Sequence, residues 1–93
     1  MIKSFRNKNT EKVFLRQIPK GFPSNLARRA FRKLRMLDQA KNIDDLRVLP
    51  GNSLEQLKGQ RQGQYSIRIN EQWRICFEWR LDGVYSVEIV DYH

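Results

Sequence analysis

The sequence is poor in the residues that form disulfides, metal centres and membrane spans. It contains one cysteine, Cys76, and one histidine, His93, among 93 residues. A single cysteine excludes a disulfide within the chain and suits a reducing compartment, and no second cysteine or histidine stands at the spacing of a metal site. No apolar run approaches the roughly 20 residues that span a bilayer, and the first residues contain no apolar signal segment. These absences predict a cytoplasmic protein that uses no metal or other cofactor and does not contact a membrane.

Acidic residues are also scarce. Ten Asp and Glu residues stand against 18 Lys and Arg residues, so the formal net charge is +8. This excess favours a polyanionic partner, through electrostatic steering and neutralisation of phosphates. The length predicts a single domain over residues 1–93, which buries about 60 to 65% of the surface of its unfolded chain and leaves little room for a deep cleft.

The second half of the chain has the period-two alternation of β-strands. Two stretches, residues 65–69 and 73–80, share an apolar face that contains Tyr65, Ile67, Ile69, Trp73, Ile75, Phe77 and Trp79. Asp82-Gly83 predicts a type I′ hairpin turn, which requires φ > 0 at both residues, into a third strand over residues 84–90. The resulting antiparallel meander has an apolar face that needs a cover and a charged face, with Arg74 and Glu78, that is open to solvent.

Two amphipathic helices in the first half of the chain can supply that cover. Asn9 or Thr10 is predicted to cap a helix that runs through Gln17. Pro23 and Ser24 open a second helix, whose apolar stripe consists of Ala27, Ala30, Phe31, Leu34 and Leu37. We expect residues 1–5 to form an edge strand, and residues 42–56 a loop with one short extended piece around 47–49. The predicted fold class is therefore α+β, a compact domain with two N-terminal helices on one face of a mainly antiparallel sheet.

A set of polar and charged side chains is expected where the charged face meets residues 57–61 and the end of the chain: Lys58, Arg61, Arg68, Arg74, Asp91, Tyr92 and His93. Cleavage of RNA by its own 2′-OH needs a proton acceptor, a donor for the leaving 5′-oxygen and cations for the phosphate, but no metal. Arg74 can hold a phosphate, and His93, Tyr92 or Lys58 can move protons. The ordinary alternatives are a sheet face held by cross-strand Arg/Glu pairs and a frayed terminal histidine.

The polar side of the second helix is strongly basic, with Arg28, Arg29, Arg32, Lys33 and Arg35. Such a run is either a solvated helix face or an electrostatic surface for an RNA backbone. In the second case Arg28 and Arg32 would be RNA-binding residues.

Three stretches together resemble the HigB-type "plasmid maintenance killer" toxins of the RelE/ParE superfamily. They are MIKSF at the start, LKGQRQGQYSIRINEQWRICFEW in the middle and VDYH at the end. The resemblance covers essentially the whole chain and implies a RelE-like fold, ribosome-dependent cleavage of translated mRNA with inhibition of translation and growth, and neutralisation by a HigA-type antitoxin. That antitoxin would carry a helix-turn-helix domain that binds operator DNA. The toxin would contact this DNA only indirectly, through the antitoxin. The family positions associated with RNA binding and cleavage correspond here to Lys58, Arg74, Asp91, Tyr92 and His93.

One position departs from part of the family, and two other functions remain open. Some HigB-type toxins have a histidine shortly before the LKG segment, where this chain has Glu55 and Gln56. A ParE-like toxin would act on DNA gyrase without cutting RNA, and it would not need the terminal DYH. A plain RNA-binding or ribosome-binding module would need only the net charge of +8.

Overall fold

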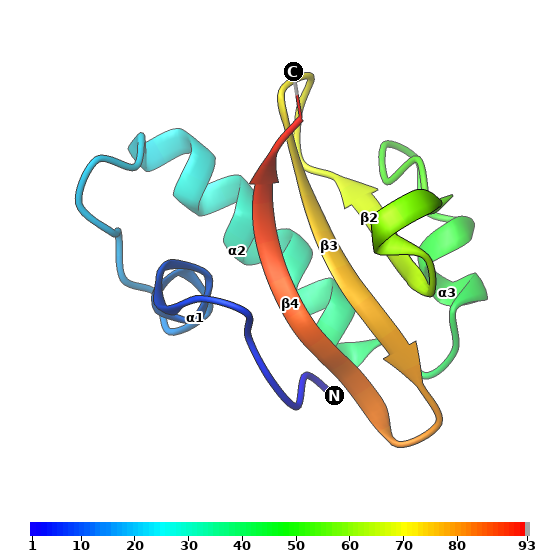
Figure 1. Ribbon diagram of the computed structural model, residues 1–93. Helices are drawn as coiled ribbons and strands as arrows, with labels where there is room; N and C mark the ends of the chain where they lie inside the picture. The colour runs from blue at the N-terminus through cyan, green and yellow to red at the C-terminus, as the bar shows by residue number, and fades with distance from the viewer. Residues whose placement is uncertain (93) are drawn as a thin grey trace.

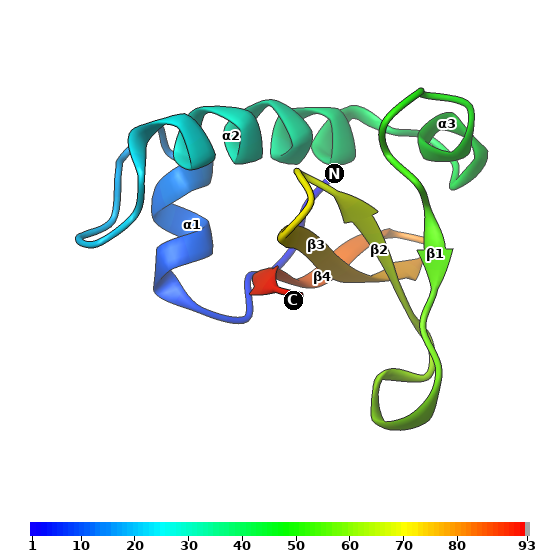
Figure 2. The same ribbon diagram turned by 90° about the horizontal axis from the view of Figure 1, so that it is seen from above.

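Helix α2 lies along one face of a four-stranded antiparallel sheet in the computed structural model, which describes residues 1–92 (Figures 1 and 2). The strands lie in the order β1-β2-β3-β4. In chain order the elements are α1 (Lys8–Phe14), α2 (Ser24–Gln39), α3 (Asp44–Arg47), β1 (Glu55–Gln56), the 3-10 helix η1 (Gly59–Arg61), β2 (Gln64–Arg68), β3 (Trp73–Arg80) and β4 (Gly83–Asp91). The predicted α+β class, with two N-terminal helices on one face of the sheet, is confirmed.

The core lies between α2 and the sheet face that the alternation predicted. Ile67 on β2 and Ile75 and Phe77 on β3 are completely buried. They pack in one cluster with the α2 stripe, in which Leu26, Ala27, Ala30, Leu34 and Leu37 are buried. The opposite face of the sheet, called the open face below, carries Ser66, Arg68, Arg74, Cys76 and Glu88. Strand parity therefore assigned β2 and β3 to the correct faces.

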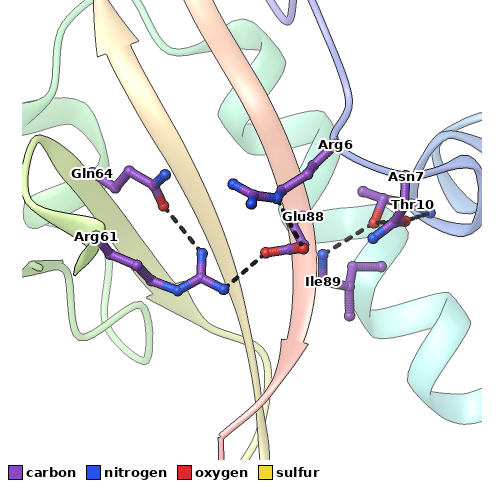
Figure 3. A network of polar contacts seen from close by, with 7 residues as sticks. All are labelled: Arg6, Asn7, Thr10, Arg61, Gln64, Glu88 and Ile89. Carbon is purple, nitrogen blue, oxygen red and sulfur yellow. Dashed lines mark hydrogen bonds and ion pairs between the residues drawn. The ribbon is translucent and has the colours of Figure 1, made fainter.

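Helix α1 begins earlier and ends earlier than predicted. Its cap is Asn7, whose side-chain oxygen accepts a hydrogen bond from the Thr10 backbone N–H at 2.9 Å. Thr10 is instead an interior residue of the helix. Its Oγ1 accepts the backbone N–H of Ile89 on β4 at 3.0 Å (Figure 3). The helix ends at Phe14, and Arg16 then adopts a left-handed φ of 66°. The hydroxyl of Thr10 thus joins α1 to the last strand.

Residues 1–5 lie at the edge of the sheet, beside β4, as two isolated parallel bridges rather than as a continuous strand. Ile2 is opposite Val84 and Phe5 is opposite Val87. Between these bridges β4 contains a bulge at Ser86, which has a φ of 56° and donates its backbone N–H to the Ser4 hydroxyl at 2.8 Å. The predicted edge position is correct, but the bulge breaks the ladder into two points of contact.

The hairpin between β3 and β4 does not use the predicted turn residues. Arg80 pairs with Gly83, so the two connecting residues are Leu81 and Asp82. Within residues 1–92, the non-glycine residues with positive φ are Arg16, Ser53 and Ser86, so the turn is not type I′. Gly83 is needed for a different reason, because a Cβ there would lie 2.6 Å from Cγ of Lys3 and 2.8 Å from the carbonyl oxygen of Met1.

The predicted extended piece around residues 47–49 is wrong, since residues 44–47 form helix α3. Asn42 accepts the Asp45 backbone N–H, and the Asp45 carboxylate accepts the backbone N–H groups of Lys41 and Asn42. These hydrogen bonds lower the pKa of Asp45. They open a short helix that places Leu46 in the core with no exposed surface. Strand β1 follows and pairs with β2, which adds a fourth strand to the predicted meander.

Candidate functional site

Arg74 lies on the open face, as strand parity predicted, but it is not open to solvent. Its exposed fraction is 8%. Its Nε donates to Ser66 Oγ at 2.8 Å, and its Nη2 donates to the carbonyl oxygens of Ser66, at 3.3 Å, and Ser53. The expectation of a solvated side chain fails because the Arg74 side chain extends across β2 to Ser53 and Glu55, and the pairing of β1 with β2 was not predicted from the sequence. Arg74 is therefore a cation held in a fixed position by three hydrogen bonds.

The remaining neighbours of the Arg74 guanidinium are exposed. The Glu55 carboxylate, on β1, has one oxygen 3.8 Å from Nη1 of Arg74, and the Glu55 side chain is 56% exposed. The ring of Tyr92 lies 5.8 Å from the guanidinium carbon, in a cation–π arrangement. Nε and Nη2 of the guanidinium are thus fastened to the protein, Nη1 lies near an accessible carboxylate, and an accessible aromatic ring lies beside the guanidinium carbon.

Asp91 and Tyr92 are held by the turn between β2 and β3. The Tyr92 backbone N–H donates to the Gln72 carbonyl oxygen at 2.6 Å, and the Gln72 side chain donates to the Asp91 carboxylate at 3.1 Å. Asp91 pairs with Trp73, the residue next to Arg74. The structure therefore brings Tyr92 beside Arg74, whereas Asp91, as the partner of Trp73, belongs to the other face of the sheet. The predicted role of His93 lies outside the described residues.

Arg61 reaches across the open face from the connection between β1 and β2. Its guanidinium donates to Glu88 at 3.1 Å and to Gln64 at 3.2 Å, and Arg6 lies 3.6 Å from the second Glu88 oxygen (Figure 3). Glu88 sits opposite Cys76 in the sheet. Glu88 thus orients Arg61 as well as forming the ion pair expected of a polar sheet face.

Lys58 is exposed and immediately precedes η1, in a connection that extends away from α2 (Figure 2). Arg68 pairs directly with Arg74 across β2 and β3, and its Nε donates to the Asn70 carbonyl at 3.0 Å. Arg68 has the strand parity of Arg74, at the border of the open face.

Arg28 and Arg32 do not join this group. Both are exposed on α2, which covers the opposite face of the sheet. The sheet itself separates these residues from Arg74. One strand of RNA on the open face would not contact them.

Sequence reasoning missed three groups around Arg74: the Ser53 carbonyl, the Ser66 hydroxyl and the Glu55 carboxylate. Ser66 could have been found, because period-two alternation already placed it on the same face. Cys76, the free cysteine beside them, is buried, and this burial raises the pKa of its thiol. Within residues 1–92, no three His, Cys, Asp or Glu side chains are grouped so that they could hold a metal ion.

Residues 3–93 match the family model described as "RelE-like toxin of type II toxin-antitoxin system HigB". The chain belongs to this HigB-like toxin family. It is 45% identical over 71 residues to Toxin HigB-1 of Vibrio cholerae, a match covering 76% of this chain and 74% of the relative. It is also 33% identical over 93 residues to Endoribonuclease HigB of Proteus vulgaris, with both chains covered completely. The predicted resemblance is confirmed.

Two solved structures share the fold of this HigB-like chain. They are a YoeB–YefM complex and a heterotetrameric YoeB–YefM toxin–antitoxin complex, both from Staphylococcus aureus. The TM-scores are 0.58 and 0.62, at 18% identity, and each match covers 100% of this chain and 95% of the other. At this identity the likeness supports the RelE-like fold. Among residues 1–92 of the HigB-like chain, no helix has the length and apolar character to cross a membrane.

Proposed function

We propose that this HigB-like toxin is an endoribonuclease that cleaves translated mRNA by attack of a ribose 2′-OH on the adjacent phosphate. The main support is that Arg74 is buried and fixed in position by three hydrogen bonds. Its Nη1 group lies near the exposed Glu55 carboxylate. A preorganised cation of this kind stabilises the charge that builds on the phosphoryl oxygens and costs no reorganisation during the reaction. The name of the Proteus vulgaris relative supports the same activity.

The other residues of the open face have roles that follow from their positions. Arg68 pairs with Arg74, Arg61 lies on the same face of the sheet and Lys58 precedes η1, and we propose that these three cations hold phosphates on either side of the cleaved bond. Tyr92 lies against Arg74 and can donate a proton to the leaving 5′-oxygen, a role it would share with His93. Asp91 accepts the side chain of Gln72 and would position this chain end rather than contact RNA.

Cleavage should depend on translating ribosomes. The site is a shallow surface on a small basic protein, with few means of holding RNA in an in-line geometry, and the ribosome would supply that alignment. Arg28 and Arg32, on the far side of the sheet, would then contact ribosomal RNA instead of the cleaved strand. Purified protein is expected to cut mRNA in a translation reaction at least about 10²-fold faster than the same RNA alone.

The measurement is primer extension on one mRNA, with and without ribosomes, and with an initiation inhibitor as the control for translation. Comparable cleavage of naked RNA would contradict ribosome dependence. A purified protein that cuts the mRNA neither with nor without ribosomes, but blocks DNA supercoiling by gyrase, would instead support the ParE-like alternative.

We also propose a HigA-type helix-turn-helix antitoxin as the neutralising partner, through which operator DNA is contacted indirectly. Its interface would be of standard size, roughly 1,200 to 2,000 Å² in total. Because the chain carries a charge of +8, acidic groups on the antitoxin would speed association, and α2 presents Arg28, Arg32 and Arg35 on its exposed side.

The association rate with this antitoxin is expected to fall at least about tenfold between roughly 0.01 and 0.15 M salt, as screening shortens the range of the attraction. Stopped-flow fluorescence measures the rate. The double variant Arg28→Gln/Arg32→Gln should associate more slowly at low salt, and the matched control Lys8→Gln/Lys12→Gln removes the same charge from α1. Equal rates at both salt concentrations would refute the electrostatic part of this proposal.

A further inference from the structure

Two arginines from distant parts of the sequence meet at one carboxylate on the open face. Arg61 reaches Glu88 from the connection between β1 and β2, with its Nη2 3.1 Å from Oε1. Arg6 reaches Glu88 from the edge of the sheet beside β4, with its Nε 3.6 Å from Oε2 (Figure 3). The Glu88 side chain is 17% exposed, whereas those of Arg61 and Arg6 are 35% and 56% exposed. The cluster therefore has two accessible cations around one mostly buried carboxylate.

Arg6 is fixed at its backbone and accessible at its guanidinium. Its backbone N–H donates to the carbonyl oxygen of Val87, the residue before Glu88, at 2.9 Å. Its Nε faces Glu88, and among residues 1–92 its two Nη groups have no hydrogen-bond partner. The planar fork of these groups matches two oxygens of a phosphate. An exposed ion pair at 3.6 Å is weak, so a phosphate can bind this guanidinium without breaking a strong contact.

The cluster lies next to Arg74 along the sheet. Glu88 pairs with Cys76 on β3, and Cys76 is two residues from Arg74 on the same face. Two residues of a strand span about 7 Å. This length is close to the step between successive phosphates of an extended RNA strand. Glu78, the next acidic residue along β3, is already paired with Arg80 at 2.8 Å. A strand whose cleaved phosphate lies at Arg74 therefore presents a neighbouring phosphate to the cations around Glu88.

We propose that Arg6 and Arg61 form a second phosphate site for the RNA strand, an inference that rests on the endoribonuclease function proposed above. Arg6 binds the phosphate through its two Nη groups, and Glu88 keeps both guanidiniums on one side of the site. The single carboxylate leaves a net positive charge that a phosphate neutralises. The site binds and aligns the strand, and no covalent bond is made or broken there.

The competing explanation is that Arg6 only ties residues 1–6 to β4 through its ion pair. Replacing Glu88 separates the two cases, because Glu88→Gln keeps an acceptor for Arg61 and removes the negative charge. At a phosphate site, Glu88→Gln strengthens RNA binding while Arg6→Gln weakens it. In a purely structural ion pair, both variants lose the same contact and act in the same direction.

The test measures single-turnover cleavage of mRNA on translating ribosomes at increasing toxin concentration, which separates the half-saturating concentration from the maximal rate constant. Arg6→Gln is expected to raise the half-saturating concentration at least about threefold, and to change the maximal rate constant less than about twofold. The plot of log affinity against log salt should become shallower by about 0.7, the value of one phosphate contact to a single strand. The control Lys8→Gln removes the same charge at an exposed position of α1 and should change none of these quantities.

Arg6→Gln should melt like the parent, because more than half of the Arg6 side chain is exposed. A smaller rise in the half-saturating concentration, or a larger change in the maximal rate constant, would overturn the second phosphate site and leave the endoribonuclease function standing. So would a Glu88→Gln variant that weakens binding as much as Arg6→Gln. Equal weakening of Arg6→Gln binding to ribosomes without mRNA would assign the phosphate to ribosomal RNA and also overturn the site. A parent protein that cuts no RNA would contradict the proposed function itself.

Discussion

Replacing Arg74 with alanine is expected to lower ribosome-dependent cleavage by about 10² to 10³, the usual loss when a preorganised transition-state donor is removed. Stability should fall as well, by about 2 to 3 kcal/mol, because the change leaves the Ser53 and Ser66 carbonyls and the Ser66 hydroxyl without their charged donor. The solvent-exposed Arg74 predicted from the sequence would imply parental stability for this variant, whereas its 8% exposure in the structure implies the loss.

The loss of activity must be separated from the loss of stability. Arg74→Lys keeps the charge but not the planar fork, so it should remain well below the parent in cleavage. Ser66→Ala removes one partner and keeps the guanidinium, and it should lose stability with a smaller effect on rate. Arg80→Ala, on the exposed end of the same strand, is the matched control and should change neither. Near-parental cleavage by folded Arg74→Ala protein would remove this residue from the site.

Replacing Asn52 with alanine is expected to cause the largest loss of stability, about 2 to 4 kcal/mol. The change leaves the Leu46 carbonyl and the Lys33 ammonium without their hydrogen-bond partner. Asn52 has no exposed surface, and its side chain donates to the Leu46 carbonyl at 3.1 Å and accepts from the Lys33 ammonium. Its own carbonyl accepts the Arg68 backbone N–H at 2.7 Å. One residue therefore joins α2, α3 and β2. Burial, together with the charge of Arg29, lowers the pKa of Lys33.

Thermal unfolding followed by circular dichroism measures this effect, at roughly 4 to 8 °C for each kcal/mol in a domain of this size. Asn9→Ala, at an exposed position of α1, is the control and should melt like the parent. Because Asn52 precedes Ser53, whose carbonyl holds Arg74, the variant should also lose cleavage activity at temperatures where it remains folded. A melting temperature within 2 or 3 °C of the parent, roughly the effect of half a kcal/mol, would show that Asn52 is dispensable.

Sequence patterns predicted the parts of the fold that repeat. The alternation in β2 and β3 placed Ile75 and Phe77 in the core and Arg74 on the other face. The predicted stripe of α2 matches the buried residues except that Leu26 was missed and Phe31 is only partly buried. Strand β1 has only two residues, too few for any period to appear. Helix α3 follows a turn held by hydrogen bonds between Asn42 and Asp45, residue types that are ordinary loop composition in a sequence.

The candidate site was predicted in composition more than in geometry. Charge and residue type identified Arg74 and Tyr92, and the structure brings these two together. The Arg74 guanidinium donates to the backbone carbonyl of Ser53. Every residue type has this carbonyl, so the contact cannot be predicted from the sequence. Glu55 was noted only as a departure from some relatives, because its approach to Arg74 requires the pairing of β1 with β2.

The pairing of residues 1–6 with the last strand also has a consequence for the order of folding. The backbones of Lys3 and Arg6 donate to Val84 and Val87, so the outer edge of β4 is completed by residues from a distant part of the sequence. Contacts of such long sequence separation form late. The edge of β4 is therefore expected to close only after the β2–β3–β4 meander, whose contacts are more local, has formed.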